Sequence, residues 1–354
     1  MVDQFETAFA AYTQAHSAIS VCNGTAALQS AIHAIDIKPG DEVIVPAITF
    51  CATANAILYS GGTPVFADIL PETLLIDVDD VARKITPKTK AIIAVDYAGQ
   101  PCDYTRLRQL TDQFNLYLLS DACHSLGAYY EQNPVGSLAD LNCFSFHPVK
   151  PLTCGEGGMI TVNTDDSELA ERLCQRLRCF RNHGIETDHR DRHRTGQFEY
   201  DMKQLGFNLR LTDIQCALGL SQLSKLDMFT NERQRIAAEY RRLLRPLNDF
   251  QPLVALPNRT HAYHLMVIRC GSRRNTVFSE LRKRHIATNV HYRPVYQHTY
   301  YRKQNDATTP HCPNAESAYD QILSLPIFPG LKDTQLQHVY QSLSEISHTL
   351  PVSV

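Results

Sequence analysis

The first half of the chain alternates short apolar runs with stretches of helical periodicity. Most of the apolar runs between residues 19 and 162 lack the polar alternation of a half-exposed strand, as expected where helices cover both faces of a sheet. The runs that we interpret as strands are Ile19–Cys22, Glu42–Val45, Pro64–Asp68, Ala91–Asp96, Leu116–Asp121, Cys143–His147 and Met159–Val162. Helical patterns such as Ala26–Ile35 and Tyr104–Asn115 lie between them. The pattern predicts an α/β domain with a mainly parallel, seven-stranded sheet.

The periodicity changes in the second half of the chain. Thr212 and Gln215 have the spacing of a capping box, and apolar residues at helical spacing then continue as far as Leu243. We expect one long helix here, of the kind that often bridges two domains. The division that follows is a large domain of residues 1–230 and a smaller C-terminal α+β domain of residues 231–354.

Composition narrows the class of protein. The formal net charge of -3 gives no broad attraction to nucleic acid or to an anionic membrane. The eleven cysteines are odd in number and include no C-x-x-C pair, which argues against a disulfide framework and a zinc ribbon. No basic-then-apolar leader opens the chain, and no apolar run approaches the roughly 18 residues of a membrane helix. We therefore expect a cytoplasmic protein.

A lysine follows the end of one predicted strand. Lys150 closes the segment Phe-Ser-Phe-His-Pro-Val-Lys, and a glycine-rich return, Gly155–Gly158, comes soon after. Such a lysine would project into the crevice where open α/β sheets bind ligands. Pyridoxal phosphate (PLP) chemistry needs a lysine at that kind of position, to hold the cofactor covalently and to move a proton. A lone lysine is otherwise a solvated surface residue, so other motifs must support this interpretation.

An acidic residue ends another apolar strand. Asp121 and His124 belong to the segment Ser-Asp-Ala-Cys-His. PLP accepts electrons only while its pyridine nitrogen stays protonated, so a buried carboxylate must face that nitrogen. Asp121 fits this role, and His124 is placed to reach the ring hydroxyl. The alternative for an aspartate at a strand end is a helix cap.

The turn after the first strand predicts a phosphate cradle. It reads Asn-Gly24-Thr25-Ala26, and the exposed N–H groups at the start of the next helix attract an anion. This motif is weak when taken alone, because many helices begin with Gly-Thr. Phe50, after the second strand, offers an aromatic face to a pyridine ring, although it is equally a candidate core residue.

Taken in this order, the motifs resemble the sugar aminotransferase family called DegT/DnrJ/EryC1/StrS, over nearly the whole chain. The resemblance implies the aspartate-aminotransferase-like fold, PLP-dependent transferase fold type I, and an aminotransferase activity. It implies that Ser145 and the Gly24-Thr25-Ala26 turn bind the cofactor phosphate, and that Asp121 and His124 bind its ring. The segment Phe207-Asn208-Leu209-Arg210 would reach the neighbouring subunit's site. Asn208 would then bind phosphate, and Arg210 would approach substrate, in a homodimer with shared active sites.

A closer resemblance is to family members that act in pseudaminic acid synthesis. It rests on the segments Asp96–Gly99, Ser145–Pro151 and Val290–Tyr296. It implies L-glutamate as amino donor and amination at C4 of a UDP-linked 2-acetamido-2,6-dideoxy-4-keto hexose. The candidate substrate contacts are His147, His291, Tyr292 and Tyr296, of which the last three would otherwise form an aromatic patch within the small domain. In the polar stretch Ile185–Lys203, which we expect to be a long loop, Arg190, Arg192 and Arg194 are candidates to meet a diphosphate.

Three alternatives stay open beside this interpretation. A sugar 3-dehydrase of this fold replaces the lysine by histidine, so Lys150 argues against it. Amination of a different nucleotide keto sugar, dTDP-linked or at C3, is the nearest rival. A catalytically idle regulator or scaffold is the third, and the joint presence of Lys150, Asp121 and Ser145 argues against it.

Two further expectations concern a metal and the start of the chain. His189 and His193 have the spacing of helical metal ligands but no acidic partner pattern, so we expect no metal site. The resembling family carries a segment ahead of the part that matches Phe5. We therefore expect that piece, which packs near the dimer and substrate site, to be absent here.

Overall fold

A computed structural model describes residues 1–187, 189–196, 198–304 and 310–349. Its centre is a seven-stranded sheet with the strand order β1-β9-β8-β5-β4-β2-β3. The strands are β1 (Ser17–Val21), β2 (Glu42–Pro46), β3 (Thr63–Ala67), β4 (Thr89–Val95), β5 (Tyr117–Asp121), β8 (Leu141–Ser145) and β9 (Gly158–Val162). Only β9 runs antiparallel to its neighbours; the other neighbouring strands pair in parallel. The mainly parallel sheet and its predicted strands are confirmed.

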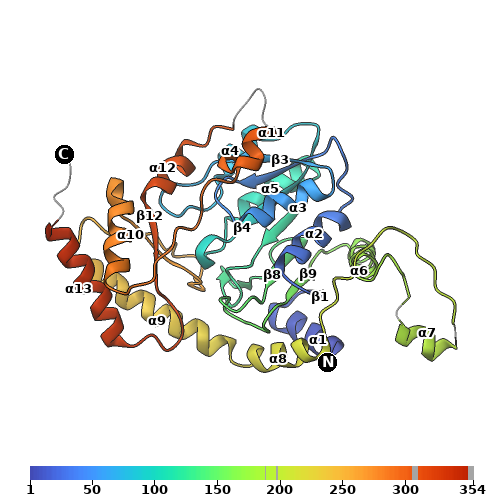
Figure 1. The fold of residues 1–354 in the computed structure, drawn as a ribbon. Coiled ribbons are helices and arrows are strands. Elements are labelled where there is room, and N and C mark those ends of the chain that lie inside the picture. Colours follow the sequence, from blue (N-terminus) through green and yellow to red (C-terminus); the bar gives the residue numbers. More distant parts are fainter. Residues whose placement is uncertain (188, 197, 305–309, 350–354) are drawn as a thin grey trace.

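Helices cover this sheet and connect its strands (Figure 1). Those of the first half are α1 (Val2–Thr13), α2 (Gly24–Ala34), α3 (Cys51–Tyr59), α4 (Val78–Lys84), α5 (Tyr104–Phe114) and α6 (Ser167–Arg181), with a 3-10 turn at Tyr97–Gly99 and a small hairpin of β6 (Tyr129–Tyr130) and β7 (Asn133–Pro134). Helix α2 packs on β8 and β9, and α6 packs on β1 and on α2. Because the parallel strands share one direction, their carboxyl ends meet at a single edge of the sheet.

A smaller unit follows in the second half of the chain. Its antiparallel sheet has the order β10-β11-β12, formed by β10 (Gln251–Pro252), β11 (Met266–Arg269) and β12 (Ile322–Leu325). Its helices are α9 (Leu226–Leu244), α10 (Arg274–Lys283), α11 (Thr299–Gln304), α12 (Pro313–Gln321) and α13 (Asp333–Thr349), with 3-10 turns at Gly271–Arg273 and Val295–Gln297. A separate apolar core, which includes Ile236, Tyr240, Leu281 and Leu336, packs α9, α10 and α13 on this sheet.

The long helix predicted after Thr212 is two helices. The predicted capping box is present: Thr212 caps α8 (Asp213–Leu223) and Gln215 bonds back to it. The helix then breaks at Ser224, whose Oγ donates a hydrogen bond to the backbone oxygen of Ser221 (3.0 Å). A new helix, α9, begins at Leu226.

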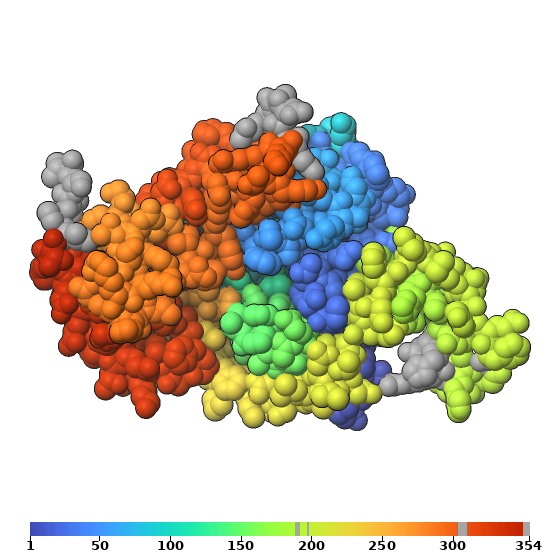
Figure 2. All heavy atoms as spheres, in the orientation of Figure 1, coloured from blue at the N-terminus to red at the C-terminus, as the bar shows by residue number. Residues whose placement is uncertain are grey.

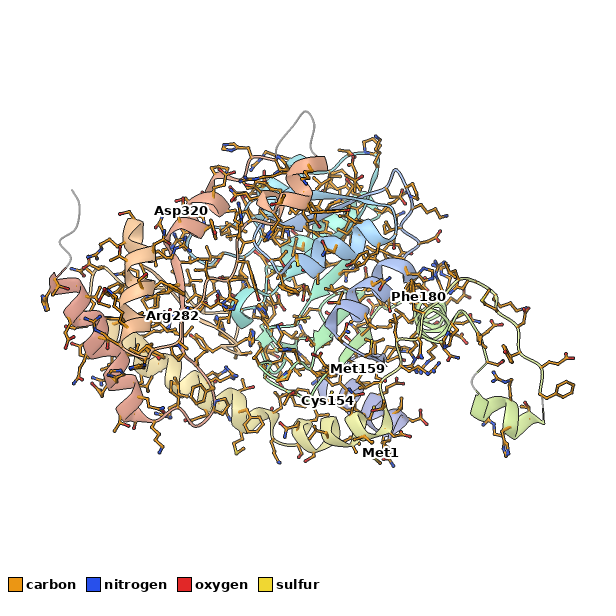
Figure 3. The ribbon with its side chains drawn as sticks, viewed as in Figure 1. Met1, Cys154, Met159, Phe180, Arg282 and Asp320 are labelled. Atoms are coloured by element: carbon orange, nitrogen blue, oxygen red, sulfur yellow. The ribbon has the colours of Figure 1, made fainter. Side chains whose placement is uncertain are left out.

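An arm projects from the body between α6 and α8. It comprises the described residues 183–187, 189–196 and 198–207, and α7 (His189–Thr195) lies at its far end (Figures 1 and 2). The expected loop therefore contains a short helix. No glycine or proline occurs between Ile185 and Gly196. At the arm's base, Phe180 (labelled in Figure 3) stacks on His33, with 4.0 Å between the ring centroids. Phe180 also meets Phe207 edge-on, with 5.3 Å between the centroids.

The base of the arm is also fixed by a buried carboxylate. Glu6 of α1 accepts hydrogen bonds from Arg181 (2.6 Å) and Arg178 (3.0 Å) of α6 and from the backbone N–H of Ser20 in β1 (2.8 Å). Burial alone would raise the pKa of Glu6, but the two arginines hold it below its usual value. The ionised carboxylate therefore ties α1, β1 and α6 together.

None of the described helices is both long and apolar enough to span a membrane. All eleven cysteines carry free thiols.

Candidate active site

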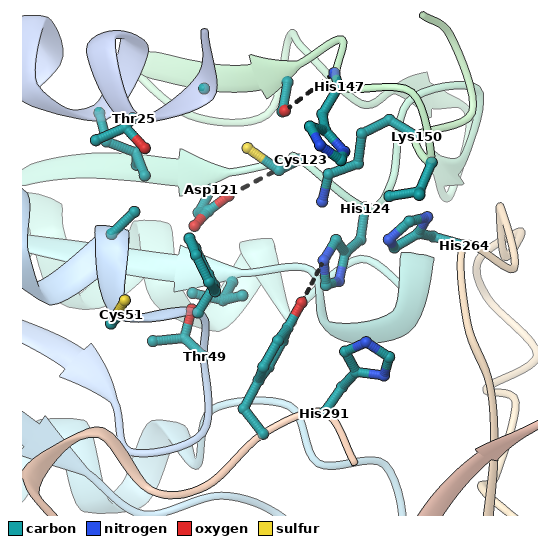
Figure 4. A pocket seen from close by; sticks show the side chains of 18 of the residues that line it. Thr25, Thr49, Cys51, Asp121, Cys123, His124, His147, Lys150, His264 and His291 are labelled. Atoms are coloured by element: carbon teal, nitrogen blue, oxygen red, sulfur yellow. Dashed lines mark hydrogen bonds between the residues drawn. The ribbon is translucent and has the colours of Figure 1, made fainter. Parts of the chain in front are cut away.

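A cavity of about 770 Å³ lies at the carboxyl edge of the central sheet. It is reached by the ends of β4, β5 and β8, the start of α2, the segment before α3, and residues 289–293 of the smaller unit (Figure 4). The cavity brings together many of the residues that the sequence singles out: Gly24, Thr25, Phe50, Asp121, His124, Ser145, His147, Lys150, His291 and Tyr292. Parallel strand ends and the return of the C-terminal segment thus converge on one place.

Lys150 projects into this cavity from the turn after β8. The turn is closed by a hydrogen bond from the Lys150 N–H to the His147 carbonyl (2.9 Å). Burial lowers the pKa of Lys150, against the opposing effect of Cys123 and Asp121. Its amine makes no hydrogen bond or ion pair with any residue that the structure describes. The side chain is therefore available as a base or as a covalent anchor.

Asp121 ends β5 with its carboxylate held in one orientation. Its Oδ2 accepts a hydrogen bond from Thr53 Oγ1 (2.7 Å), and its Oδ1 accepts one from the Cys123 N–H (3.2 Å). Thr53 lies on α3 and shares a further hydrogen bond with Thr49 (2.7 Å). Both threonines and Asp121 are buried. A fixed, buried carboxylate at the floor of a cavity can face and stabilise a protonated ring nitrogen.

Two histidines stand beside Lys150. The rings of His124 and His264 lie 4.4 Å apart, and His124 Nε2 is 3.2 Å from the Tyr292 hydroxyl. Burial and the charge of Lys150 hold the pKa of His124 well below its usual value, and burial does the same for His264. Both imidazoles are therefore neutral at physiological pH. The Nδ1 atom of each is buried without a partner among the described residues, which leaves capacity for a bound molecule.

The start of α2 lies against Ser145. A Cβ at Gly24 would come within 2.7 Å of the Ser145 Cβ, so glycine permits this close approach. Asn23 caps the helix by accepting a hydrogen bond from the Ala26 N–H (2.8 Å). The N–H groups of Gly24 and Thr25 have no partner within the helix, and with the Ser145 hydroxyl they form a cradle for a phosphate. Ala26, whose N–H is already used, does not line the cavity.

These residues fit PLP. Lys150 can anchor the cofactor covalently, and the buried carboxylate of Asp121 can face its ring nitrogen. The exposed ring of Phe50 offers a stacking face, and the N-terminus of α2 offers a phosphate site. The buried Nδ1 of His124, which has no partner in the described part of the protein, is consistent with a missing ring substituent. Three or more metal-ligating side chains do not gather anywhere among the described residues.

The structure leaves several predicted residues outside the cavity of a single chain. Tyr296 is buried in the core, where it packs near Phe66 (5.6 Å between ring centroids) and donates a hydrogen bond to Glu316 (2.6 Å). It does not line the cavity. Asn208 and Arg210, at the base of the arm, do not line the cavity, although Leu209 between them accepts a hydrogen bond from the Cys22 N–H (2.8 Å), next to the lining residue Asn23. Arg192 and Arg194 lie on α7, outside the cavity lining. The side chain of Arg190 lies outside what the structure describes.

Other lining residues carried no sequence signal that we recognised. They are Cys51, Cys123, His264, Asn289, Arg293, His298 and Tyr319. The role of Thr53 was not predicted either. A buried threonine on an otherwise apolar helix indicates a hydrogen-bond partner in the adjoining sheet, here Asp121. The others depend on how the smaller unit folds back over the strand ends, which no local motif encodes.

A sheet whose strand ends bring a free lysine, a buried carboxylate and a helix N-terminus into one cavity defines a PLP-dependent transferase of fold type I. The chain belongs to the DegT/DnrJ/EryC1/StrS aminotransferase family, whose model matches residues 1–344. The chain is accordingly a PLP-dependent sugar aminotransferase. The family, fold class and cofactor predicted from the sequence are confirmed.

Individual relatives agree with this assignment. The spore coat polysaccharide biosynthesis protein SpsC of Bacillus subtilis is 37% identical over 98% of this chain and 89% of its own. Helicobacter pylori PseC, an aminotransferase involved in the biosynthesis of pseudoaminic acid, is 34% identical with a TM-score of 0.89, over 99% of this chain and 91% of its own. The PMP-form of the putative sugar aminotransferase Spr1654 from Streptococcus pneumoniae is 32% identical with a TM-score of 0.90, over 98% and 92%.

Proposed function

We propose that this enzyme transfers the amino group of L-glutamate to C4 of a UDP-linked 2-acetamido-2,6-dideoxy-4-keto hexose, as in pseudaminic acid synthesis. The observation that carries the proposal is that His291 and Tyr292, from the segment resembling that group of enzymes, line the same cavity as Lys150 and Asp121. The similarity to PseC supports it.

We propose that Lys150 is the acid–base residue of both half-reactions. PLP supplies, when bound, an electron sink for the negative charge that develops on the substrate carbon. Because burial lowers its pKa, a larger fraction of the Lys150 amine is neutral at a given pH and so able to accept a proton from the amino donor. In the second half-reaction the same amine returns a proton at the sugar carbon. One residue serves both directions by microscopic reversibility.

The remaining residues bind and orient. Asp121, fixed by Thr53, accepts the hydrogen bond of the protonated pyridine nitrogen. Gly24, Thr25 and Ser145 would hold the phosphate of the cofactor, and Phe50 would stack on its ring. Tyr292 positions His124 through their hydrogen bond, so that the imidazole meets the ring hydroxyl. His147, at the rim of the cavity, and His291 contact the substrate.

We propose a cytoplasmic homodimer in which the arm completes the partner's active site. Residues 1–230 would form the cofactor-binding domain and 231–354 the small domain. On the arm and at its base, Phe198, Tyr200, Met202, Leu205 and Phe207 are exposed, as apolar side chains are where a second subunit covers them. Asn208 and Arg210 are also exposed and do not line the cavity of their own chain. The free thiols suit a reducing compartment.

Subunit complementation tests the shared site. Lys150→Ala and Asn208→Ala proteins should each be inactive, and mixing them under conditions of subunit exchange should restore part of the activity. With sites shared across the interface, a heterodimer has one site with both defects and one site with neither. If each site belonged to one chain, every site would keep a defect and no activity would return. A fully active monomer would also contradict the shared site.

A panel of nucleotide keto sugars tests the substrate. With glutamate present, mass spectrometry should detect amination of the UDP-linked 2-acetamido-2,6-dideoxy-4-keto hexose at C4, at a kcat/KM at least about tenfold above that for dTDP-linked sugars. Preference for a dTDP-linked sugar, or amination at C3, would replace the substrate assignment but keep the class of reaction. A protein that binds PLP yet does not react with glutamate would indicate a regulator or scaffold.

A further inference from the structure

The segment before the 3-10 turn at Val295–Gln297 carries an arginine to which the proposed function assigns no role. Arg293 is the one arginine among the described residues that line the cavity. It makes no hydrogen bond or ion pair with any part of the chain that the structure describes, and its Nε is buried without a partner. A buried donor of this kind is unfavourable unless a bound molecule supplies the acceptor. The position therefore points to an anionic ligand.

The backbone on either side of Arg293 is fixed. Asn289 exchanges hydrogen bonds with Ser324 of β12 (2.8 and 3.3 Å), and the Val295 N–H donates to the carbonyl of Ala47 (2.9 Å). The hydroxyl of Tyr97 donates to the backbone oxygen of His291. The segment is thus held by both the small unit and the central sheet. A ligand at Arg293 meets a preorganised backbone, so binding orders little besides the side chain.

The other charges of the cavity leave Arg293 without a competitor. Burial lowers the pKa values of four of the five lining histidines, His124, His264, His291 and His298, so these four are neutral at physiological pH. Lys150 is committed to the cofactor in the proposed function. Of the two acidic lining residues, Asp121 is bonded to Thr53, and Glu156 lies 3.8 Å from His147. Arg293 therefore presents a persistent positive charge to whatever enters.

We propose that Arg293 is the substrate-anion site of the reaction cavity: it binds the carboxylate of the amino donor or the diphosphate of the nucleotide sugar. This inference rests on the proposed function, in which both substrates occupy the same cavity in turn because one lysine serves both half-reactions. A planar guanidinium forms paired hydrogen bonds with either a carboxylate or a phosphate group.

Equilibrium binding to the PLP-loaded enzyme tests this site. Two probes separate the sources: 2-oxoglutarate, which carries the carboxylates, and UDP-N-acetylglucosamine, which carries the diphosphate without a keto group. Calorimetry should show that Arg293→Ala weakens one or both probes by about 10- to 100-fold, and that Arg293→Lys recovers part of the loss. Arg302→Ala, which removes an exposed arginine of α11, should leave both affinities unchanged. The melting temperature and cofactor absorption of Arg293→Ala should match the wild type.

The outcomes are distinct. Weaker binding of both probes supports one anion site shared by the two substrates. Weaker binding of a single probe supports the site and identifies which anion it takes. Unchanged affinity for both probes in the folded variant overturns the inference. A wild-type enzyme that binds neither probe contradicts the proposed function itself, and this inference with it, before any variant is compared.

Discussion

Replacement of Lys150 by alanine should abolish transamination, with a loss of more than about 10³-fold in kcat. The variant should also lose the absorption band of the lysine-linked cofactor, because no other lysine lines the described cavity. PLP should still bind, since the phosphate cradle at Gly24 and Ser145 does not depend on Lys150. Absorption spectra and turnover assays on the purified protein measure both effects.

A surface lysine provides the matched control for this variant. Lys90 is exposed, and Lys90→Ala should keep both the absorption band and the activity. Retention of the band in Lys150→Ala would mean that another lysine anchors the cofactor. Loss of folding would be recognised by a lowered melting temperature, and Lys150→Arg, which keeps the charge, would then carry the test.

Asp121→Asn should leave the fold intact and slow both half-reactions by roughly 10²-fold. A neutral amide cannot hold a proton on the pyridine nitrogen, and a hydrogen bond to a charged group contributes about 1.5–3 kcal/mol. The amide can still accept the hydrogen bond that Thr53 donates to Oδ2, so little folding stability should be lost. Single-turnover measurements with glutamate and with a keto sugar report the two half-reactions separately.

The control for Asp121→Asn is Asp112→Asn on the exposed face of α5. This substitution changes the net charge by the same amount and should leave the rates of both half-reactions unchanged. Near-normal rates in Asp121→Asn would mean that a carboxylate other than Asp121 faces the ring. Asp96 is the neighbouring candidate, since burial raises its pKa to about 6, although hydrogen bonds from Ser125 and Tyr104 already engage it.

The central sheet and its lysine and aspartate were predictable for one physical reason. Apolar runs of strand length, separated by helices, require a parallel sheet, and the ends of parallel strands meet at one edge. Asp121 ends β5 and Lys150 follows β8. These two strands pair directly, so the proximity of the two residues follows from the order of the strands. The phosphate cradle at Gly24 could be predicted for the same reason, because α2 starts where β1 ends.

The rest of the site depends on tertiary structure. His264, Arg293 and Tyr319 reach the cavity only because the smaller unit folds back over the strand ends. Tyr296 belongs to the same segment as Tyr292, but it turns into the core, where burial against Phe66 outweighs exposure at the cavity. Local spacing does not distinguish these two directions.

Helix boundaries were less predictable than helix positions. The periodic pattern from Thr212 to Leu243 is continuous in sequence, yet the structure divides it into α8 and α9, with Ser224 and Lys225 between them. The arm shows the opposite case, since a polar stretch without an apolar stripe still contains α7. Hydrophobic periodicity indicates a helix that packs on a core. It does not indicate a helix that has no core to pack on within its own chain.

Chemical mapping of the cofactor's attachment tests the central claim most directly. Borohydride reduction of the PLP-loaded wild-type enzyme fixes the cofactor on the lysine that holds it, and mass spectrometry of the proteolytic peptides then identifies that lysine. We predict that the added mass lies on the peptide that contains Lys150, and that prior addition of glutamate prevents the labelling. Attachment to a different lysine, or no attachment in a protein that carries PLP, would contradict the account.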